Sequence, residues 1–201
     1  MSPASTSTSN VTLVDLGYGN LGSVATALER LGATVERASE PAAIAAAERL
    51  FLPGVGAANY AMARIAELGL AEPLRAFARP ALGICLGMHL LYERSEEGDS
   101  PGLGLIAGMV CKLDPAPAVT VPHMGWSQLE VETEDIGLTN GEYVYFAHSF
   151  AADDGPATVA RATHGRAIPA VVRSANWTGA QFHPERSGAV GARFLEAWLR
   201  G

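Results

Sequence analysis

The sequence is poor in lysine and has no long apolar run. Lys112 is the only lysine among 201 residues, the arginines are scattered, and the net charge is −7. The chain therefore has no basic block that could follow a phosphate backbone, and nucleic acid is not an expected partner. No apolar run approaches the roughly 18 residues that a membrane span requires, so a membrane partner is not expected either.

Cysteine is also scarce, since the chain has only Cys85 and Cys111. Two cysteines without CxxC spacing do not make a disulfide framework. Cys111 lies in the strand-like segment 110–113 and is expected to be a small apolar residue there. The histidines show no HxxxH or HExxH spacing, so we expect no metal and no cofactor.

We expect no signal sequence either, because MSPASTSTSN has neither a basic start nor an apolar segment. Apolar residues make up 48% of the chain and charged residues 17%, which is a globular composition. We therefore expect a flexible tail at residues 1–10, a single domain over residues 11–201, and a cytoplasmic protein.

The first half of the sequence alternates short apolar strands with helical patterns. Strands are predicted at 11–16, 34–37, 50–52 and 81–84, and helices at 21–31, 42–49, 59–67, 70–78 and 88–94. This alternation predicts an α/β fold with a mostly parallel central sheet and helices on both faces.

The second half is richer in strand-like segments. They lie at 119–121, 127–131, 143–146, 158–162, 170–174 and 179–182, with few helices between them, so some of these strands must be antiparallel. A last helix, 189–199, carries Phe194, Leu195 and Trp198 at helical spacing, and this stripe is expected to be core.

The segment Gly83-Ile84-Cys85-Leu86-Gly87 lies between a predicted strand and a predicted helix and fits the pattern G-x-nucleophile-x-G. The pattern places a nucleophile on a strained turn, where the flanking glycines relieve crowding. The helix amino terminus favours a thiolate, and the Leu86 amide can donate to a developing oxyanion. The plainer alternative is a buried thiol in a strand.

A second element, Gln181-Phe182-His183-Pro184-Glu185, ends a predicted strand. Residues two apart in an extended segment point the same way, so His183 and Glu185 can present an imidazole and a carboxylate on one side. The imidazole would take the thiol proton, and the carboxylate would fix the imidazole tautomer. A solvated strand end is the alternative interpretation. The occurrence of His183 and Glu185 together with the cysteine turn favours a Cys-His-Glu triad.

A third element, Leu52-Pro53-Gly54-Val55-Gly56, follows the carboxyl end of another predicted strand. Ligands sit at such ends in open α/β sheets. The glycines allow backbone amides to approach or turn towards an anion, although an ordinary strand exit would have the same sequence.

Together, these three elements resemble the class I, or triad-type, glutamine amidotransferases. Further segments resemble the glutaminase subunits of imidazole glycerol phosphate synthase, which act in histidine biosynthesis: GYGNL from Gly17, GLGLI from Gly102, PHMGW from Pro122, YFAHSF from Tyr145 and QFHPERSG from Gln181. The resemblance extends from about Val11 to the carboxyl terminus. It implies a flavodoxin-like, three-layer α/β fold.

The resemblance also implies the roles of individual residues. Cys85 would attack the side-chain amide of glutamine and form a thioester, with His183 as base and then acid and Glu185 orienting it. The oxyanion would be held by backbone amides of Leu86 and of the stretch Gly54, Val55 and Gly56. Contacts to glutamine are implied for His89 and for the strand formed by His148, Ser149 and Phe150.

The implied partner is a (β/α)8-barrel cyclase in a heterodimer. The cyclase would receive ammonia and make imidazole glycerol phosphate and an aminoimidazole carboxamide ribonucleotide. Positions near the family's interface are matched by Asn20, Met124, Trp126 and Arg186, and Trp126 is expected in a loop. Sequestration within the complex keeps ammonia from being protonated in bulk water.

Three positions depart from the family pattern. His89 stands where the family usually has glutamine, which puts the substrate contact there in doubt. Arg186 replaces the usual lysine, and Gly22 replaces a common arginine.

Three other functions stay open on the sequence. The glutaminase subunit of pyridoxal phosphate synthase shares the fold and the triad, although its pattern lacks PHMGW. A cysteine hydrolase acting alone, such as a γ-glutamyl hydrolase, would use the same three residues. A catalytically silent binding subunit would keep Cys85 merely buried.

Overall fold

The computed structural model describes residues 9–19, 21–54, 56–117 and 119–201. The expected tail lies largely outside the described residues, and Asn10 already belongs to the first strand.

The main sheet of the described chain has nine strands in the order β2-β1-β3-β4-β13-β12-β11-β8-β9. The parallel part consists of β1 (Asn10–Val14), β2 (Thr34–Ala38), β3 (Leu50–Leu52), β4 (Ala81–Ile84) and β13 (Trp177–Ala180). Of these strands, β13 is parallel to β4 and antiparallel to β12. The antiparallel continuation consists of β12 (Arg166–Ser174), β11 (Thr158–His164), β8 (His123–Val131) and β9 (Tyr143–His148). The parallel sheet expected for the first half is therefore confirmed, and so is the expectation that some strands of the second half are antiparallel.

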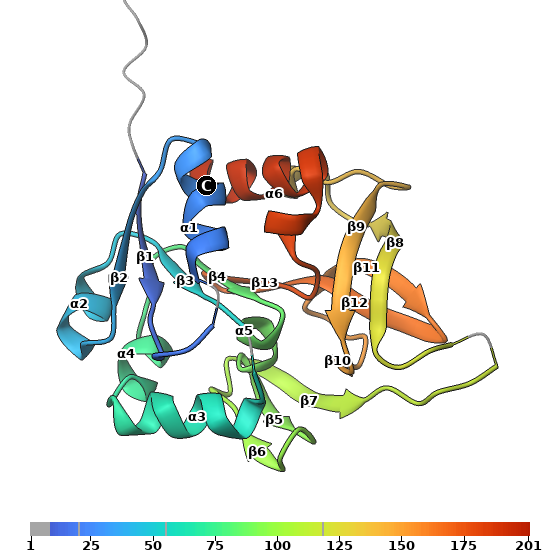
Figure 1. Cartoon of the computed structure of the whole chain (residues 1–201), viewed down its shortest axis with the longest axis horizontal. Coiled ribbons are helices and arrows are strands. Elements are labelled where there is room, and N and C mark those ends of the chain that lie inside the picture. The colour runs from blue at the N-terminus through green and yellow to red at the C-terminus, as the bar shows by residue number, and fades with distance from the viewer. Residues whose placement is uncertain (1–8, 20, 55, 118) are drawn as a thin grey trace, which may run out of the picture.

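Helices cover both faces of this sheet (Figure 1). α1 (Leu21–Arg30) and α6 (Gly188–Arg200) pack on one face, where Leu28, Phe194 and Leu195 belong to one buried cluster. On the other face are α2 (Pro41–Ala46), α3 (Ala58–Glu67) and α4 (Ala71–Arg75), whose buried side chains join a second cluster. Burial of the stripe on the last helix agrees with the prediction that it is core.

A second sheet was not anticipated from the sequence. In the described chain it contains β10 (Phe150–Ala152), β7 (Ile106–Lys112), β5 (Tyr92–Ser95) and β6 (Ser100–Pro101), in that order. The predicted helix at 88–94 is wrong, since α5 covers only Leu86–His89. The carbonyl groups of Leu90 and Leu91 accept hydrogen bonds from the amides of Leu103 and Leu105. These carbonyl groups therefore bond to the loop that contains Leu103 and Leu105 and do not form another turn of helix.

The predicted strand at 119–121 is also wrong. Only an isolated bridge joins Val119 to Ala116. Pro115, Pro117 and Pro122 surround this stretch, and a proline has no backbone N–H to donate to a ladder.

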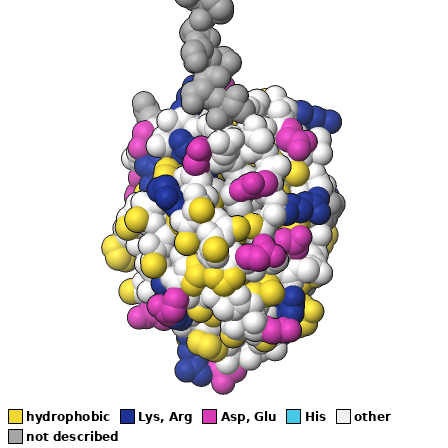
Figure 2. Space-filling model, turned by 90° about the vertical axis from the view of Figure 1, so that its left-hand side faces the viewer, with side chains coloured by type: hydrophobic (Ala, Val, Ile, Leu, Met, Phe, Trp, Pro, Cys, Tyr) yellow, Lys and Arg dark blue, Asp and Glu magenta, His cyan; other side chains and the backbone are white. Residues whose placement is uncertain are grey.

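The face beside β2 and α2 carries acidic and basic side chains that are interspersed (Figure 2). They do not gather into a continuous basic stripe on the described surface that this view shows. Among the described residues, no helix is long and apolar enough to cross a membrane.

Candidate active site

The site forms where three neighbouring parallel strands end. β4 pairs with β3 on one side and with β13 on the other, and all three run in the same direction. Their carboxyl ends lead into Pro53, Cys85 and Gln181, so segments far apart in the sequence meet at one edge of the sheet. The Cys85 amide donates to the Ala180 carbonyl oxygen at 2.7 Å, which holds the cysteine turn against the end of β13.

Cys85 has a strained backbone. Its φ of 51° and ψ of −110° lie where residues with a Cβ are rarely found, and α5 begins at the next residue. Strain of this kind is kept where the surroundings over-determine it, typically at functional sites. The predicted turn between strand and helix is therefore present, with a buried thiol at its apex.

Two glycines let the turn pack against the end of β3. A Cβ on Gly87 would lie 2.0 Å from the Leu52 carbonyl oxygen, and one on Gly54 would lie 2.3 Å from the Leu86 amide nitrogen. Neither distance is possible for a real Cβ, so backbone packs directly on backbone here. This contact brings Gly54, the first glycine of the predicted oxyanion stretch, next to the predicted oxyanion amide of Leu86.

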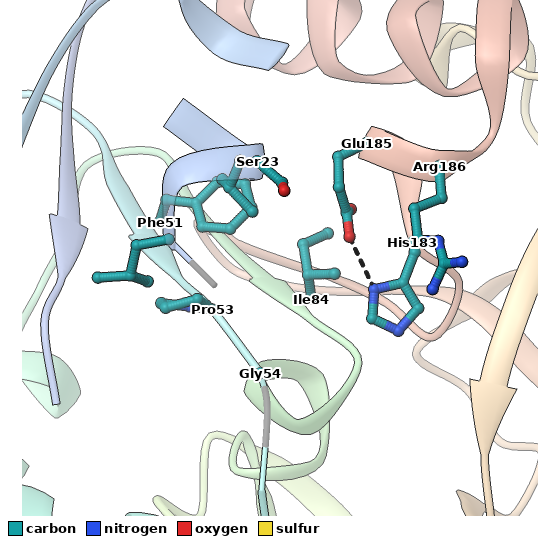
Figure 3. Close-up of a pocket in the computed structure, with 10 residues that line it drawn as sticks. Ser23, Phe51, Pro53, Gly54, Ile84, His183, Glu185 and Arg186 are labelled. Atoms are coloured by element: carbon teal, nitrogen blue, oxygen red, sulfur yellow. Dashed lines mark hydrogen bonds and ion pairs between the residues drawn. The ribbon is translucent and has the colours of Figure 1, made fainter. Parts of the chain in front are cut away.

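His183 and Glu185 meet as predicted, although not within an extended strand. His183 precedes a short 3-10 turn, Pro184–Arg186, and the pair closes across this turn. The imidazole Nδ1 lies 2.9 Å from Glu185 Oε1, as the dashed line in Figure 3 shows. Because the carboxylate is an acceptor, Nδ1 carries the hydrogen and Nε2 remains for Cys85.

The charge state of His183 follows from its neighbours. Burial alone lowers its pKa, but the interaction with Cys85 and the hydrogen bond to Glu185 outweigh burial and raise the pKa to about 10. At neutral pH the imidazole is therefore held as an imidazolium beside the sulfur. A positive charge next to a cysteine sulfur is typical of reactive cysteines in proteins.

A cavity of about 240 Å³ lies in front of Cys85. Its lining includes these residues that the sequence had indicated: Gly56, Cys85, Leu86, His89, His148, Ser149 and Phe150. His148 to Phe150 do not form one strand as expected, because β9 ends at His148 and β10 of the other sheet begins at Phe150. Val55 lies outside the described residues.

A second cavity, of about 310 Å³, lies on the α1 side of the His183–Glu185 pair (Figure 3). Its walls include Gly54 and apolar side chains from α1, β3 and β4. The two cavities share no lining residue among those described. Cys85 faces the smaller one, and His183 and Glu185 face the larger.

Glu97 also lines the smaller cavity, and sequence analysis missed it. One of its carboxylate oxygens accepts a hydrogen bond from the Ala58 amide at 3.0 Å. Burial raises the pKa of Glu97, and the bond to Ala58 opposes that change. In the sequence it lies in the acidic run Glu96-Glu97, which resembles an ordinary solvated turn.

A row of buried histidines forms one side of the site. His148 Nδ1 donates to the Phe150 carbonyl oxygen at 2.8 Å, so its Nε2 accepts from His123 Nδ1 at 3.0 Å. His123 Nε2 then accepts from the Ser127 hydroxyl at 2.8 Å. Burial, reinforced by neighbouring histidines, lowers the pKa of His148 to about 3 and that of His123 to about 4, so both are neutral.

Three of the four residues predicted to face a partner, Met124, Trp126 and Arg186, lie on one exposed patch. Met124 and Trp126 belong to β8 and not to a loop, and strand alternation turns them away from His123 and Ser127. Met124 is 64% exposed and Trp126 is 55% exposed. Asn20 lies outside the described residues.

Arg186 is joined to this patch through an aromatic ring. Its guanidinium lies 4.4 Å from the centre of the Tyr145 ring, and Trp126 meets the same ring edge-on at 6.1 Å. Tyr145 on β9 was not expected in this role, because a pairing between β8 and β9 could not be read from either segment alone.

Ser187 is another residue that the sequence did not reveal. Its buried hydroxyl donates to the His183 carbonyl oxygen at 2.7 Å and accepts from the Tyr145 amide at 3.0 Å. It thereby ties the turn that carries the imidazole to β9. In the described part of the chain, no group of three His, Cys, Asp or Glu side chains is arranged to hold a metal.

Comparison with known proteins gives consistent results. The family model described as "Glutamine amidotransferase class-I" matches residues 12–199. "Imidazole glycerol phosphate synthase subunit HisH" of Xanthomonas euvesicatoria pv. vesicatoria (strain 85-10) is 49% identical over 94% of this chain and 96% of its own length. The protein of the same name from Xylella fastidiosa (strain Temecula1) is 47% identical with the same coverage.

Solved structures resemble the chain in fold. A crystal structure described as a glutamine amidotransferase has a TM-score of 0.74 at 21% identity, covering 94% of this chain and 97% of its own. The structure of PurLQS from Thermotoga maritima has a TM-score of 0.71 at 22% identity, covering 96% of this chain and 98% of its own. At these identities the likeness concerns the fold alone.

Proposed function

The chain belongs to the class-I glutamine amidotransferase family, and on this premise we propose that it is the glutaminase subunit of an imidazole glycerol phosphate synthase in histidine biosynthesis. The observation that carries the proposal is the 49% identity to a subunit of that name over nearly the full length of both chains. The hydrogen-bonded pair of His183 and Glu185 beside a strained Cys85 supports it.

In the proposed reaction, the Cys85 thiolate attacks the side-chain carbonyl carbon of glutamine, and the carbonyl π electrons move to oxygen. When the tetrahedral intermediate collapses, the C–N bond breaks and His183 gives its proton to the departing nitrogen. Ammonia leaves and a γ-glutamyl thioester remains. His183 then takes a proton from water as that water attacks the thioester, which releases glutamate and restores the thiolate.

The oxyanion of each tetrahedral intermediate is held by backbone amides. Leu86 supplies the first, because its amide follows the nucleophile directly at the start of α5. The second comes from the stretch 54–56, of which Gly54 lies against the Leu86 amide. Contacts that exist only in the charged intermediate accelerate the reaction more than contacts to glutamine itself.

The amino-acid end of glutamine lies in the 240 Å³ cavity. Glu97 offers a carboxylate for the α-ammonium group, and the bend at Ser149 between the two sheets offers backbone groups for the α-carboxylate. His89 forms part of the wall on the α5 side. The cavity is small, which suits a single amino acid.

The partner is a (β/α)8-barrel cyclase that docks on the patch formed by Met124, Trp126, Tyr145 and Arg186. Large exposed aromatic, Met and Arg side chains are typical of the centres of protein interfaces. Met124 also lines the cavity in front of Cys85, so the patch adjoins the place where ammonia is released. An enclosed transfer in a cytoplasmic heterodimer keeps ammonia unprotonated.

Replacement of the nucleophile tests this function. In the complex, Cys85→Ala should reduce glutamine-dependent formation of imidazole glycerol phosphate by about a thousandfold or more, since the covalent route is lost. Synthesis from added ammonium salt should continue, because the cyclase does not use the thiol. Cys111→Ser is the matched control and should change neither rate. Loss of both activities in a folded Cys85→Ala complex would make Cys85 structural and contradict the proposal.

A further inference from the structure

One buried amide is not used by the mechanism above. Gln181 directly follows β13, is fully buried, and lies between two side chains of the cysteine turn. Its Oε1 is 2.7 Å from His89 Nε2, and its Nε2 is 3.9 Å from Cys85 Sγ. Hydrogen bonds hold the backbone of all three residues. The amide of Gln181 donates to the Ala170 carbonyl oxygen, and the amide of His89 donates to the Cys85 carbonyl oxygen.

The direction of these hydrogen bonds follows from the charge state of His89. Burial lowers its pKa to about 4, and the bond to Gln181 only partly opposes this, so the ring is neutral and has a single N–H. If that N–H is on Nε2, it donates to Gln181 Oε1 and the amide nitrogen faces the sulfur. If the amide is reversed, its oxygen faces the sulfur instead, and two electron-rich atoms meet whenever Cys85 is a thiolate.

The neighbouring imidazolium decides between the two arrangements. His183 is held in its charged form, and the proposed reaction uses Cys85 as a thiolate, so the arrangement with the amide nitrogen towards sulfur is the stable one. The N–S distance is long, as catalytic hydrogen bonds often are before a substrate binds.

We propose that His89 and Gln181 are positioning residues that act through each other: His89 fixes the amide of Gln181 so that its nitrogen donates to the Cys85 thiolate. The proposal rests on Cys85 being the nucleophile. Cys85 then has two partners, the imidazolium of His183 from the turn after β13 and the amide of Gln181 from the end of that strand.

This role modifies the one expected for His89 as a substrate contact. One ring nitrogen is committed to Gln181, so only Nδ1 is left for glutamine. A glutamine at position 89, as the family usually has, could donate to Gln181 through its own amide nitrogen. His89→Gln is therefore the conservative variant that should keep the arrangement.

The pH dependence of Cys85 alkylation by iodoacetamide tests the proposal without partner or substrate. The parent is the chain with Cys111→Ser, so that Cys85 is the only thiol. Other titratable groups that face Cys85 are His183, His148 from β9, His89 from α5 and Glu97 from the turn after β5. Most of these groups are present in all the variants. Differences in the pH profile of alkylation between the variants therefore report the loss of the amide donor.

Gln181→Leu should raise the apparent pKa of Cys85 by about one unit, which slows alkylation about tenfold below that pKa. His89→Leu should raise it by a smaller amount, since the amide nitrogen is present but free to turn, and His89→Gln should restore the parent profile. A purely structural role would alter the melting temperature without shifting the pH profile.

Gln181→Leu leaves the His89 N–H without an acceptor and can fail to fold. The double variant His89→Leu, Gln181→Leu removes both partners of the buried bond, which proteins tolerate better than removing one, and it should show the same upward shift. Folded variants with the parent's apparent pKa would overturn the inference. A parent that releases no glutamate from glutamine in the complex with the cyclase would instead overturn the proposed function, so the two failures can be told apart.

Discussion

The parallel and antiparallel parts of the main sheet contribute to the site in different ways. At the ends of β3 and β4 the backbone itself is the functional element, because Gly54 and Gly87 admit contacts that leave no space for a Cβ. Along β8 and β9 side chains carry the function, with His123 and His148 turned inward and Met124 and Trp126 turned outward. The first part therefore fixes the proposed nucleophile, and the second shapes the pocket and the proposed partner surface.

Between these two parts lies β13, which joins them. It pairs in parallel with β4 and antiparallel with β12. The chain that leaves it carries Gln181, His183 and Glu185, so the proposed base and the proposed amide donor to the sulfur follow the boundary strand directly.

The largest effect is expected at the boundary strand. His183→Asn should reduce glutamate release by the complex about a thousandfold, because the residue both stabilises the thiolate and transfers protons. Glu185→Gln should cost less, about a hundredfold, since the imidazole stays in place without its charge partner. His164→Asn is the matched control and should retain the parent rate. A His183→Asn complex with more than a tenth of the parent rate would contradict the triad.

The next effect tests the backbone contacts of the parallel part. Gly87→Ala forces its Cβ against the Leu52 carbonyl oxygen, so the turn or β3 must move. We expect about a tenfold or greater loss of glutamate release and a fall of about 2 kcal/mol in the free energy of unfolding, as overpacking usually gives.

The control for this change is Gly155→Ala, whose Cβ would meet no atom within 4 Å. It should leave activity and the urea midpoint unchanged. Equal behaviour of the two alanine variants would mean that the close backbone approach has no functional role.

The buried histidines should make the protein sensitive to acid. The folded pKa of His148 is about 3 and that of His89 about 4, both below the usual value of 6.5, so the unfolded chain binds more protons below pH 6.5. Stability is therefore lost as the pH falls from about 6.5, by on the order of 2 kcal/mol for each histidine at pH 5. The contribution of His183 to stability has the opposite pH dependence. Its pKa of about 10 in the folded protein lies above 6.5, so its stabilising contribution is present at low pH and is lost as the pH rises towards 10.

Urea unfolding of the parent and of His148→Gln at pH 7 and pH 5 measures this effect. The variant should lose on the order of 2 kcal/mol less than the parent between the two pH values, whatever its stability at pH 7. An identical pH dependence of both proteins would show that His148 is not the source of the acid sensitivity.

The smallest effect is expected on the outward face of the antiparallel part. Trp126→Ala should weaken binding of the cyclase about tenfold, because a large aromatic anchor is removed from the patch. Calorimetric titration with the cyclase measures it. Met109→Ala, which removes an exposed apolar side chain from β7 in the other sheet, is the control and should bind as the parent does. Unchanged binding of the cyclase by Trp126→Ala would show that the interface lies on another surface.

Much of the parallel part could be predicted from the sequence because its signals are local. The segments 50–52 and 81–84 were predicted with the bounds that the structure gives to β3 and β4. The glycines around Cys85 similarly indicated the turn between strand and helix. Local signals failed at 88–94, where the amides of Leu103 and Leu105 bind the carbonyls that a longer helix would have used.

The antiparallel part was harder to predict because its contacts join distant residues. The histidine row depends on a pairing of His123 with His148, which no spacing within either segment reveals. Gln181 and Ser187 were seen only as parts of a motif, and their partners became visible through the three-dimensional structure. Glu97 reaches the pocket from a turn that looked like a solvated acidic run.

The most direct test of the account is glutamate release from glutamine by the purified chain, alone and then with the barrel cyclase and its nucleotide ligand. Strong release only in the full complex is the predicted result, because the proposed subunit works when its partner is docked beside the pocket. Comparable release by the chain alone would contradict the account and identify an independent cysteine hydrolase.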